Sequence, residues 1–396
     1  MKADTKKTLK DLREKGLLRS PRLITQPRRP SESRHVMVDG KAALELCSND
    51  YLGLATHPEL KEAAVAATAK YGTGAGASRL VSGTMAPHVE LESAIKGFIG
   101  TESALLFNSG WHANTGIIPA LATRGGEIFT DKLDHASIID GCLISRARLR
   151  RYPHADTGKL EGLLERSTAS TKVIITDGLF SMDGDLAPVR KLVALSEKYN
   201  ARLIIDDAHG IGALGANGRG GIEELGLDTG ELTRAGTVVI GTFGKAFGSY
   251  GAFALADADT ITLLTNKARS FIYSTALPPA LCMASIKAIE IIRAEPQRRT
   301  RLRENSLLMR ELLSDRGLKT IKGSSHIIPV IIGGAEEATQ VAASLLEDGV
   351  FIQAIRPPTV APQTARLRIT VSSEHTKEEL RKAATLIQEA VGGQRD

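Results

Sequence analysis

A lysine and an aspartate follow two apolar runs of this sequence. Lys245 lies in a glycine-rich segment directly after Val238–Ile240, and Asp206 and His209 follow Leu203–Ile205. Each run is typical of a short buried strand. In open α/β sheets, binding and catalytic residues lie beyond the carboxyl ends of the parallel strands. An amine at one strand end and a carboxylate plus an imidazole at another predict a pyridoxal phosphate (PLP) site. There the lysine holds the cofactor as a Schiff base and the aspartate pairs with the pyridinium nitrogen.

Other interpretations of the glycine-rich segments stay open. A lone lysine in a glycine-rich turn is usually a solvated loop residue, and such a lysine can also belong to a phosphate-binding loop. That loop has Ser or Thr after the lysine and four residues between its glycines, whereas here Ala246 follows, and two residues separate Gly241 from Gly244. The segment Gly72–Ala77 loosely matches a dinucleotide-binding fingerprint, but a helical pattern precedes it where that motif has a strand.

The composition is that of a globular protein with a substantial core. Of the 396 residues, 42% are hydrophobic and 24% are charged, which suffices for two domains or for one large domain with an appendage. No apolar stretch reaches the length of a membrane span, and the N-terminus lacks the apolar core of a signal peptide. Three cysteines without a CxxC pair argue for reduced thiols and against a zinc site. We therefore expect a cytoplasmic protein with no metal and no membrane partner.

A formal net charge of +6 favours acidic partners. Basic residues cluster in three stretches, 2–34, 146–151 and 293–303. Nucleic-acid binding is one interpretation, but the chain has few aromatic residues, no recognition motif and acidic residues throughout, so we expect no nucleic-acid partner. A positive surface also suits an acidic small molecule or carrier protein through electrostatic steering. Most of these stretches are expected to be solvated surface.

Apolar runs alternate with helical patterns over residues 100–275, which predicts βαβ units around a largely parallel sheet. The expected strands of this α/β region are Ser103–Phe107, Val173–Thr176, Leu203–Ile205 and Val238–Ile240. A long helix over Ala280–Ala294 then leads into a smaller α/β segment, with strand candidates at 327–332, 351–355 and 366–371. We predict an N-terminal arm over residues 1–50, a large PLP-binding domain over 51–280 and a small C-terminal domain over 281–396.

Taken together, the motifs of the chain resemble those of the α-oxoamine synthases, PLP-dependent enzymes of fold type I that join an amino acid to an acyl thioester with loss of CO2. Because so many motifs occur in the same order as in this family, the set identifies the family far more specifically than any single motif does. The resemblance implies an aspartate-aminotransferase-like fold, with a mostly parallel sheet in the large domain. The motifs are Ser48–Leu54, Gly76–Gly83, His135–Ser137, Phe180–Asp185, Asp206–Gly210, Thr242–Lys245, Tyr273–Thr275 and Arg366–Thr370.

Within this family, the segment Ala354–Val360 most resembles the branch that makes 8-amino-7-oxononanoate in biotin biosynthesis. The chain departs from that branch where the proline expected after Val360 is displaced to Pro362, and where Trp111 replaces a more usual Phe or Tyr. The resemblance implies condensation of L-alanine with a pimeloyl thioester, delivered by CoA or by a carrier protein, into 8-amino-7-oxononanoate, CO2 and free thiol. A sister activity, such as glycine C-acetyltransferase (2-amino-3-ketobutyrate CoA ligase), stays the alternative.

The resemblance also implies roles for the catalytic residues. Lys245 forms the Schiff base and then removes the α-proton of the amino acid, for which its amine must be partly neutral. Asp206 keeps the pyridine nitrogen protonated, although a lone aspartate after a strand more often caps a turn. His135 stacks on the ring face and helps to position the substrate. His209 reaches the ring oxygen of the cofactor, with Ser181 nearby.

The phosphate of the cofactor is expected at the start of a helix. The backbone N–H groups of Gly110 and Trp111 would hold it, because their segment follows a strand and helix N-termini attract anions. Thr242 adds a hydroxyl group. In this family, the residues that match Ser274 and Thr275 serve the phosphate in the neighbouring subunit's site, which implies a homodimer.

The resemblance implies contacts between substrates and five residues: Arg19, Asn49, His135, Thr359 and Arg368. Arg368 would pair with the amino-acid carboxylate, a bidentate role that suits a guanidinium group, with Asn49 assisting. The alternative is a strand-surface arginine, and Arg366 would share its face. Arg19 and Thr359 would contact the acyl substrate, and Arg22 competes with Arg19 for that role.

Overall fold

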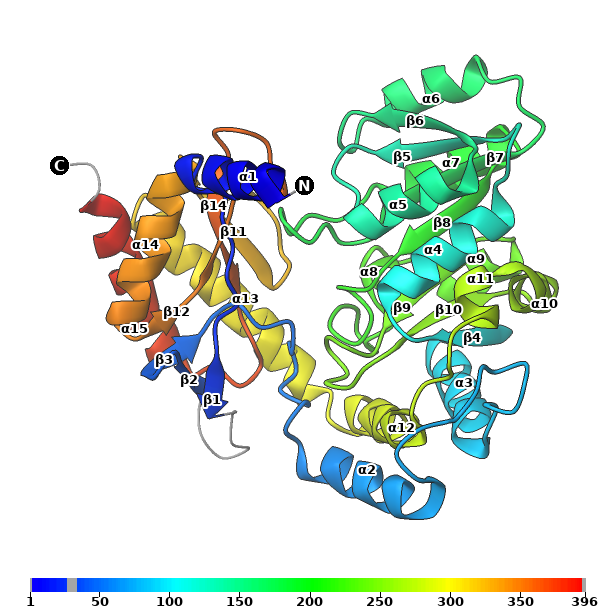
Figure 1. The fold of residues 1–396 in the computed structure, drawn as a ribbon, viewed down its shortest axis with the longest axis horizontal. Helices are drawn as coiled ribbons and strands as arrows, with labels where there is room; N and C mark the ends of the chain where they lie inside the picture. The colour runs from blue at the N-terminus through cyan, green and yellow to red at the C-terminus, as the bar shows by residue number, and fades with distance from the viewer. Residues whose placement is uncertain (1, 27–33, 394–396) are drawn as a thin grey trace. The chain divides into compact units, whose positions relative to one another are not determined.

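The computed structural model describes residues 2–26 and 34–393 of the chain, drawn as a ribbon in Figure 1. It contains two compact units. The larger unit comprises residues 52–181 and 185–299, and the smaller unit comprises residues 1–51, 182–184 and 300–396. In the described residues, no helix is both long and apolar enough to cross a membrane.

A seven-stranded sheet forms the centre of the larger unit. Strands β5 to β9 run parallel, and β10 pairs antiparallel with both β4 and β9. Hydrophobic side chains of the central strands are fully buried, as expected for a parallel sheet covered on both faces. In order across the sheet, the strands are β4 (Ser103–Phe107), β10 (Ala252–Ala256), β9 (Val238–Thr242), β8 (Arg202–Asp206), β7 (Lys172–Asp177), β5 (Glu127–Asp131) and β6 (Arg148–Tyr152).

Helices cover this sheet. Helices α4 (Gly110–Leu121) and α5 (Ala136–Ser145) pack against each other, and α12 (Pro279–Ala294) packs on α2 (Pro58–Tyr71) and α3 (Ala86–Ile99) (Figure 1). A buried cluster joins the apolar residues of α4 and α5 to strands β4, β5 and β7 to β10. The remaining helices are α6 (Thr157–Glu165), α7 (Val189–Lys198), α8 (Gly221–Glu224), α9 (Thr229–Arg234), α10 (Ala258–Lys267) and α11 (Arg269–Ile272).

The smaller unit contains two sheets. The first has the order β1 (Ile24–Gln26), β2 (His35–Val38), β3 (Lys41–Glu45) and β12 (Val350–Phe351), and the parallel pairing of β3 with β12 joins the two ends of the chain. The second has the order β11 (Ile327–Gly333), β14 (Ala365–Thr370) and β13 (Gln353–Ile355). The helices are α1 (Lys2–Glu14), α14 (Ala335–Glu347), α15 (Lys377–Gly392) and all but the first three residues of α13 (Gln297–Asp315).

The predicted strands of the larger unit are all present as β4, β7, β8 and β9. Strands β5, β6 and β10 were not predicted. The sequence of β10, Ala-Phe-Ala-Leu-Ala, is rich in alanine, which has a low strand propensity. Strand β6, Arg-Leu-Arg-Arg-Tyr, lies at the edge of the sheet and carries three arginines, as edge strands often carry charge.

Candidate active site

The register of the parallel strands brings acidic side chains to one edge of the sheet. Asp177 at the end of β7 pairs with Asp206 at the end of β8, and Asp206 pairs with Ile240 of β9. Beyond this edge lies a cavity of about 200 Å³. Its lining residues all belong to the larger unit: Gly110, Trp111, His135, Ser137, Asp177, Asp206, Ala208, His209, Thr242 and Lys245.

Asp206 is held in a fixed orientation at this cavity. Only 5% of the residue is exposed. Its Oδ2 accepts a hydrogen bond from Nδ2 of Asn114 at 2.7 Å, and its Oδ1 accepts one from the backbone N–H of Ala208 at 3.1 Å. A buried carboxylate with fixed orientation can bind a cationic ring N–H, which is what a pyridinium group offers.

His135 is the N-cap residue of α5. Its backbone N–H donates to Asp177 Oδ2 at 2.8 Å, and its ring Nδ1 lies 2.8 Å from Ser137 Oγ. The ring meets the indole of Trp111 edge to face, with 6.4 Å between the ring centroids. Burial lowers the pKa of His135, and the Asp206 carboxylate opposes this shift. A neutral imidazole with a fixed ring plane therefore faces the cavity.

The N-terminus of α4 offers two backbone donors to this cavity. Ser109 caps the helix: its Oγ accepts from the backbone N–H of His112 at 3.2 Å, and its carbonyl accepts from Ala113 at 2.9 Å. The first N–H groups of a helix have no intrahelical acceptor, and those of Gly110 and Trp111 have no acceptor among the described residues. Two open N–H groups at a helix N-terminus suit a phosphate group.

The loop after β9 holds Lys245 by its own hydrogen bonds. Thr242 Oγ1 donates to the carbonyl of Gly251 at 2.8 Å and accepts from the N–H of Gly244 at 3.2 Å. The N–H of Gly248 donates to the carbonyl of Lys245 at 2.9 Å. Lys245 is half-buried and lines the cavity with Asp206 and His135. An amine, a carboxylate and two phosphate donors around one cavity together fit PLP.

Gly248 closes the lysine loop in a conformation that alanine adopts poorly. Its φ is +62°, and a β-carbon there would overlap the backbone of Leu54 and Ala55. We predict that Gly248→Ala lowers the free energy of unfolding by about 2–4 kcal/mol, because the cost of a left-handed alanine adds to the cost of the overlap with the backbone. Chemical denaturation measures the effect. Gly236→Ala is the matched control, because φ is +94° at that position with nothing within 4 Å of the added carbon. An equal loss in both variants would contradict the overlap.

Buried carboxyl groups support the cavity from behind. Asp134 Oδ1 accepts from the backbone N–H of Asp177 at 2.9 Å, and burial raises the pKa of Asp134 to about 7. Burial, with repulsion from Asp134 and Asp206, raises the pKa of Asp177 well above its usual range. Burial likewise raises the pKa of Asp207 to about 7, although its Oδ2 accepts a 2.7 Å bond from the N–H of Gly221. The protonated forms of these groups therefore persist to unusually high pH.

The raised pKa of Asp207 predicts a pH-dependent stability. The unfolded chain loses this proton near pH 4, but the folded chain keeps it until about pH 7. The folded state binds more protons between these values, so stability falls as pH rises through this window, by at most roughly 4 kcal/mol. We expect Asp207→Asn to lose less stability between pH 5 and pH 8 than the wild type. Urea unfolding at both pH values tests this, and equal losses would contradict it.

Three predicted cofactor contacts do not line this cavity. Ser181 lies in the turn that follows β7 and is not among the lining residues. Ser274 and Thr275 follow α11. Thr275 is exposed, and its carbonyl accepts a hydrogen bond from Asn108 Nδ2 at 2.8 Å. In this chain, Ser274 and Thr275 therefore lie outside the space that Lys245 faces.

Two predicted substrate contacts meet in the smaller unit. Arg368 on β14 donates to Asn49 Oδ1 at 3.3 Å, and the same oxygen accepts from the hydroxyl of Tyr51 at 3.0 Å. Burial raises the pKa of Tyr51 to about 12, which keeps this hydroxyl protonated. Arg366 instead pairs with Asp183 and donates to the carbonyl of Thr364 at 3.0 Å. The two arginines thus have different partners, as the sequence alone did not show.

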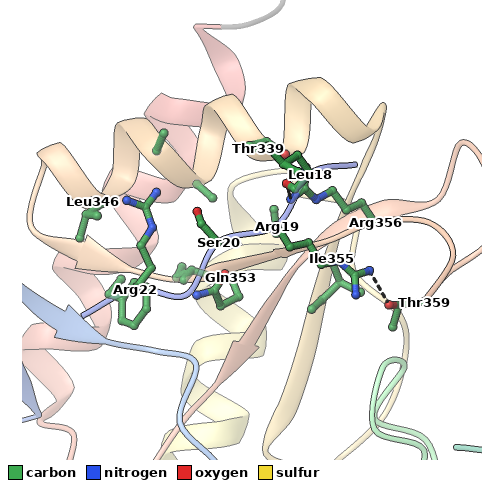
Figure 2. A pocket seen from close by; sticks show the side chains of 15 residues that line it. Leu18, Arg19, Ser20, Arg22, Thr339, Leu346, Gln353, Ile355, Arg356 and Thr359 are labelled. Atoms are coloured by element: carbon green, nitrogen blue, oxygen red, sulfur yellow. Dashed lines mark hydrogen bonds between the residues drawn. The ribbon is translucent and has the colours of Figure 1, made fainter. Parts of the chain in front are cut away.

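A second cavity, of about 410 Å³, lies in the smaller unit (Figure 2). Arg19 and Thr359 both line it, and Arg19 Nη2 donates to Thr359 Oγ1 at 3.2 Å. Arg22 lines it too, but its guanidinium is paired with Asp39 at 2.8 Å. Arg356 holds the adjoining backbone by donating to the carbonyls of Gly16 and Leu18. The rest of the lining is mostly apolar, with the polar residues Ser20, Thr339 and Gln353 among Leu18, Ala342, Ala343, Leu346, Phe351, Ile352, Ala354 and Ile355.

Sequence reasoning missed three residues of the first site, namely Asp177, Ser137 and Asn114. Asp177 carried the signal that found Asp206, since it is an acidic residue directly after a predicted buried strand. Ser137 stood in a quoted motif but received no role. Asn114 gave little signal, because a single asparagine inside an apolar helix can face in any direction, and its contact with Asp206 spans 92 residues.

Comparison with known proteins gives consistent matches over nearly the whole chain. The family model for aminotransferase class I and II matches residues 41–387. The chain is 50% identical over 382 residues to the 8-amino-7-oxononanoate synthase of Geobacter metallireducens, covering 96% of this chain and 95% of that one. The structure is similar to a serine palmitoyltransferase from S. paucimobilis with bound PLP and myriocin, at a TM-score of 0.90 and 29% identity, covering 97% and 96% of the two chains. It is also similar to the 8-amino-7-oxononanoate synthase of Francisella tularensis, at a TM-score of 0.77 and 29% identity, covering 89% and 99%.

Proposed function

This chain belongs to the aminotransferase class I and II family, and we propose that it joins L-alanine to a pimeloyl thioester with loss of CO2, forming 8-amino-7-oxononanoate and free thiol in biotin biosynthesis. The observation that carries this is the identity of about half of all residues with 8-amino-7-oxononanoate synthases over nearly the full length. The family match and the similar proteins confirm the predicted fold type, PLP as the cofactor and the acyltransferase activity.

Lys245 and Asp206 carry the central roles in this proposal. PLP, when bound, supplies an electron sink that stabilises negative charge at Cα of the amino acid. Lys245 would anchor the cofactor and would remove the Cα proton of the amino acid with its neutral amine. Asp206 would accept a hydrogen bond from the pyridine N–H and keep that nitrogen protonated. Its fixed orientation supports this role, because both of its oxygens are already held by donors.

The remaining cofactor contacts are assigned by their chemistry. Gly110 and Trp111 would bind the phosphate through their open N–H groups, and Thr242 would add its hydroxyl. His209, which is buried at the cavity, and Ser181 would reach the ring oxygen. Ser274 and Thr275 would serve the phosphate of a neighbouring subunit, so we propose a homodimer as the active form. Their position outside this chain's own cavity is what such a shared site requires.

Arg368 would bind the carboxylate of L-alanine, with Asn49 as its partner. The 3.3 Å bond between them keeps the guanidinium in place while leaving further N–H groups for a carboxylate. His135 would cover the ring face and position the substrate. Because the chain has three cysteines and no CxxC pair, we propose that the reaction takes place in the reducing cytoplasm.

Arg19 and Thr359 would bind the acyl substrate in the second cavity. We predict that Arg19→Ala raises the KM for pimeloyl-CoA about tenfold and leaves kcat little changed, because a charge-assisted hydrogen bond in substrate binding is lost. Arg22→Ala is the matched control. Its guanidinium is already paired with Asp39, so its loss should lower thermal stability more than substrate affinity. Steady-state kinetics of both variants measure these effects. A larger rise in KM for Arg22→Ala than for Arg19→Ala would assign the acyl-substrate contact to Arg22 instead.

A thiol-release assay on the PLP-loaded protein tests the function. The assay crosses L-alanine, glycine and L-serine with pimeloyl-, acetyl-, succinyl- and palmitoyl-CoA. Preference for L-alanine with pimeloyl-CoA is expected. Preference for glycine with acetyl-CoA would give the sister activity, glycine C-acetyltransferase, and preference for serine with palmitoyl-CoA would follow the structural similarity to serine palmitoyltransferase. If no CoA ester reacts, pimeloyl carrier protein is the next acyl donor to assay.

A further inference from the structure

A chain of hydrogen bonds links Asp206 to His135 through two buried side chains. Asn114 Nδ2 donates to Asp206 Oδ2 at 2.7 Å and to Ser137 Oγ at 2.9 Å, and Ser137 Oγ lies 2.8 Å from His135 Nδ1. Asn114 is fully buried and Ser137 is 1% exposed. We propose that Asn114 and Ser137 are positioning residues that fix His135 as a neutral imidazole protonated on Nε2. The use of that imidazole rests on the function proposed above.

The orientation of the Asn114 amide follows from its partners. Its nitrogen has two hydrogens and no lone pair for accepting, and both hydrogens go to oxygen atoms. Turning the amide around would place its oxygen against the carboxylate of Asp206, where two acceptors would repel each other. Its Oδ1 accepts no hydrogen bond from the described residues, so nothing there favours the reversed orientation. Asn114 therefore acts as a donor on both sides.

The hydrogen of Ser137 is then committed to His135. The hydroxyl accepts from Asn114 and keeps a single hydrogen, which it donates to His135 Nδ1 when that nitrogen carries a lone pair. The backbone N–H of Ser137 points to the same ring nitrogen at 3.2 Å. Nδ1 thus accepts from two donors and cannot also carry a proton. The proton of the neutral ring is on Nε2, the ring nitrogen without a partner among the described residues.

The charges around His135 leave this arrangement intact. Burial is the largest influence on its pKa and lowers it; Asp206 and Asp140 raise the pKa, whereas Lys245 lowers it. The Asp177 carboxyl group is occupied by the backbone N–H of His135, not by the ring. Protonating Nδ1 would set its hydrogen against the backbone N–H of Ser137 and would turn the Ser137 hydroxyl from a donor to the ring into an acceptor. The hydrogen-bond chain and the burial therefore favour the same neutral form.

The fixed tautomer limits what His135 does in the reaction. Its Nε2–H can donate a hydrogen bond to a substrate oxygen, but with Nδ1 committed to its two donors the ring does not take up a proton. Proton transfer at Cα then belongs to Lys245 alone. Asn114 also donates directly to Asp206, so one side chain links the orientation of Asp206 to that of His135.

Nitrogen NMR of the protein labelled with 15N-histidine tests the inference without any turnover. The signal of His135 is assigned by its loss in His135→Gln. The wild type should show Nδ1 unprotonated and Nε2 protonated, with and without PLP. Ser137→Ala removes the hydroxyl but keeps the backbone N–H that donates to Nδ1, so the Nδ1–H tautomer should become partly populated; Ser137→Thr, which keeps the hydroxyl, should restore the wild-type signal. Thr115→Ala is the matched control on α4, because among the described residues its hydroxyl donates to the carbonyl of Trp111 and forms no hydrogen bond with Ser137 or His135.

Kinetics supply the second readout. Ser137→Ala should lower kcat about five- to tenfold and move the acid limb of the kcat profile to higher pH, with Ser137→Thr near the wild type. An Nδ1-protonated ring in the wild type, or an unchanged His135 signal in folded Ser137→Ala, would overturn the inference. Asn114→Ser, checked by its melting curve, gives an independent variant that should show the same mixed tautomers. The NMR result holds or fails whichever substrates the enzyme prefers.

Discussion

Replacing Lys245 by alanine is expected to remove at least about four orders of magnitude of turnover, the largest loss among the substitutions considered. The side chain has two tasks, anchoring the cofactor and removing the Cα proton, and the general-base task alone is typically worth about 10²- to 10⁴-fold. The visible absorbance of the lysine Schiff base should disappear from the PLP-loaded protein as well. Thiol release in the assay above, together with the absorption spectrum, measures both losses.

Two further variants show whether the activity lost in Lys245→Ala reflects the missing amine, the missing positive charge or a general effect of replacing a lysine. Lys245→Arg keeps a positive charge at the cavity, but a guanidinium group forms no Schiff base and is never neutral near pH 7. It should therefore be as inactive as Lys245→Ala. Lys267→Ala removes an exposed lysine at the end of α10 and should keep full activity. Turnover of Lys245→Ala near the wild-type rate would overturn the assignment of the base.

The predictable part of the site was the part built on parallel strands. Buried strands have continuous apolar sequences, and a polar residue directly after such a run marks its carboxyl end. This logic found Asp206, His209 and Lys245, and the structure brings all three to one cavity. It failed at β10, whose apolar sequence Ala-Phe-Ala-Leu-Ala is rich in alanine, a residue with low strand propensity. Strand β10 nevertheless fixes the lysine loop, since Gly251 just before it accepts from Thr242.

The unpredictable part was the identity of partners that are distant in sequence. Arg366 and Arg368 alternate on one strand, and only the fold shows that one meets Asp183 and the other Asn49. Arg19 and Arg22 lie three residues apart, and their difference comes from Asp39 in the turn between β2 and β3. A sequence pattern gives the direction of a side chain relative to its own helix or strand. It does not give the residue from a distant part of the chain that the side chain contacts.

The network around Asp206 shows why a single substitution at this residue should have two separable effects. Its carboxylate serves the cofactor nitrogen, and it also accepts the hydrogen bond that starts the chain through Asn114 to His135. In Asp206→Asn, one orientation of the new amide puts its nitrogen against Asn114 Nδ2, and the other puts it against the N–H of Ala208. Either orientation sets two donors against each other, and both remove the negative charge.

Asp206→Asn is therefore expected to lower kcat by about 10²- to 10³-fold, because the charge that stabilises the protonated ring nitrogen is lost, and to lower the melting temperature. The double variant Asn114→Asp with Asp206→Asn exchanges donor and acceptor across the 2.7 Å contact. It should recover much of the melting temperature but little of kcat, since the carboxylate now lies on α4 and not at the end of β8. Differential scanning calorimetry and thiol release on the same preparations measure the two effects. Recovery of both together would mean that Asp206 acts only through packing, whereas recovery of stability alone means that catalysis needs the carboxylate at position 206 and the amide at position 114.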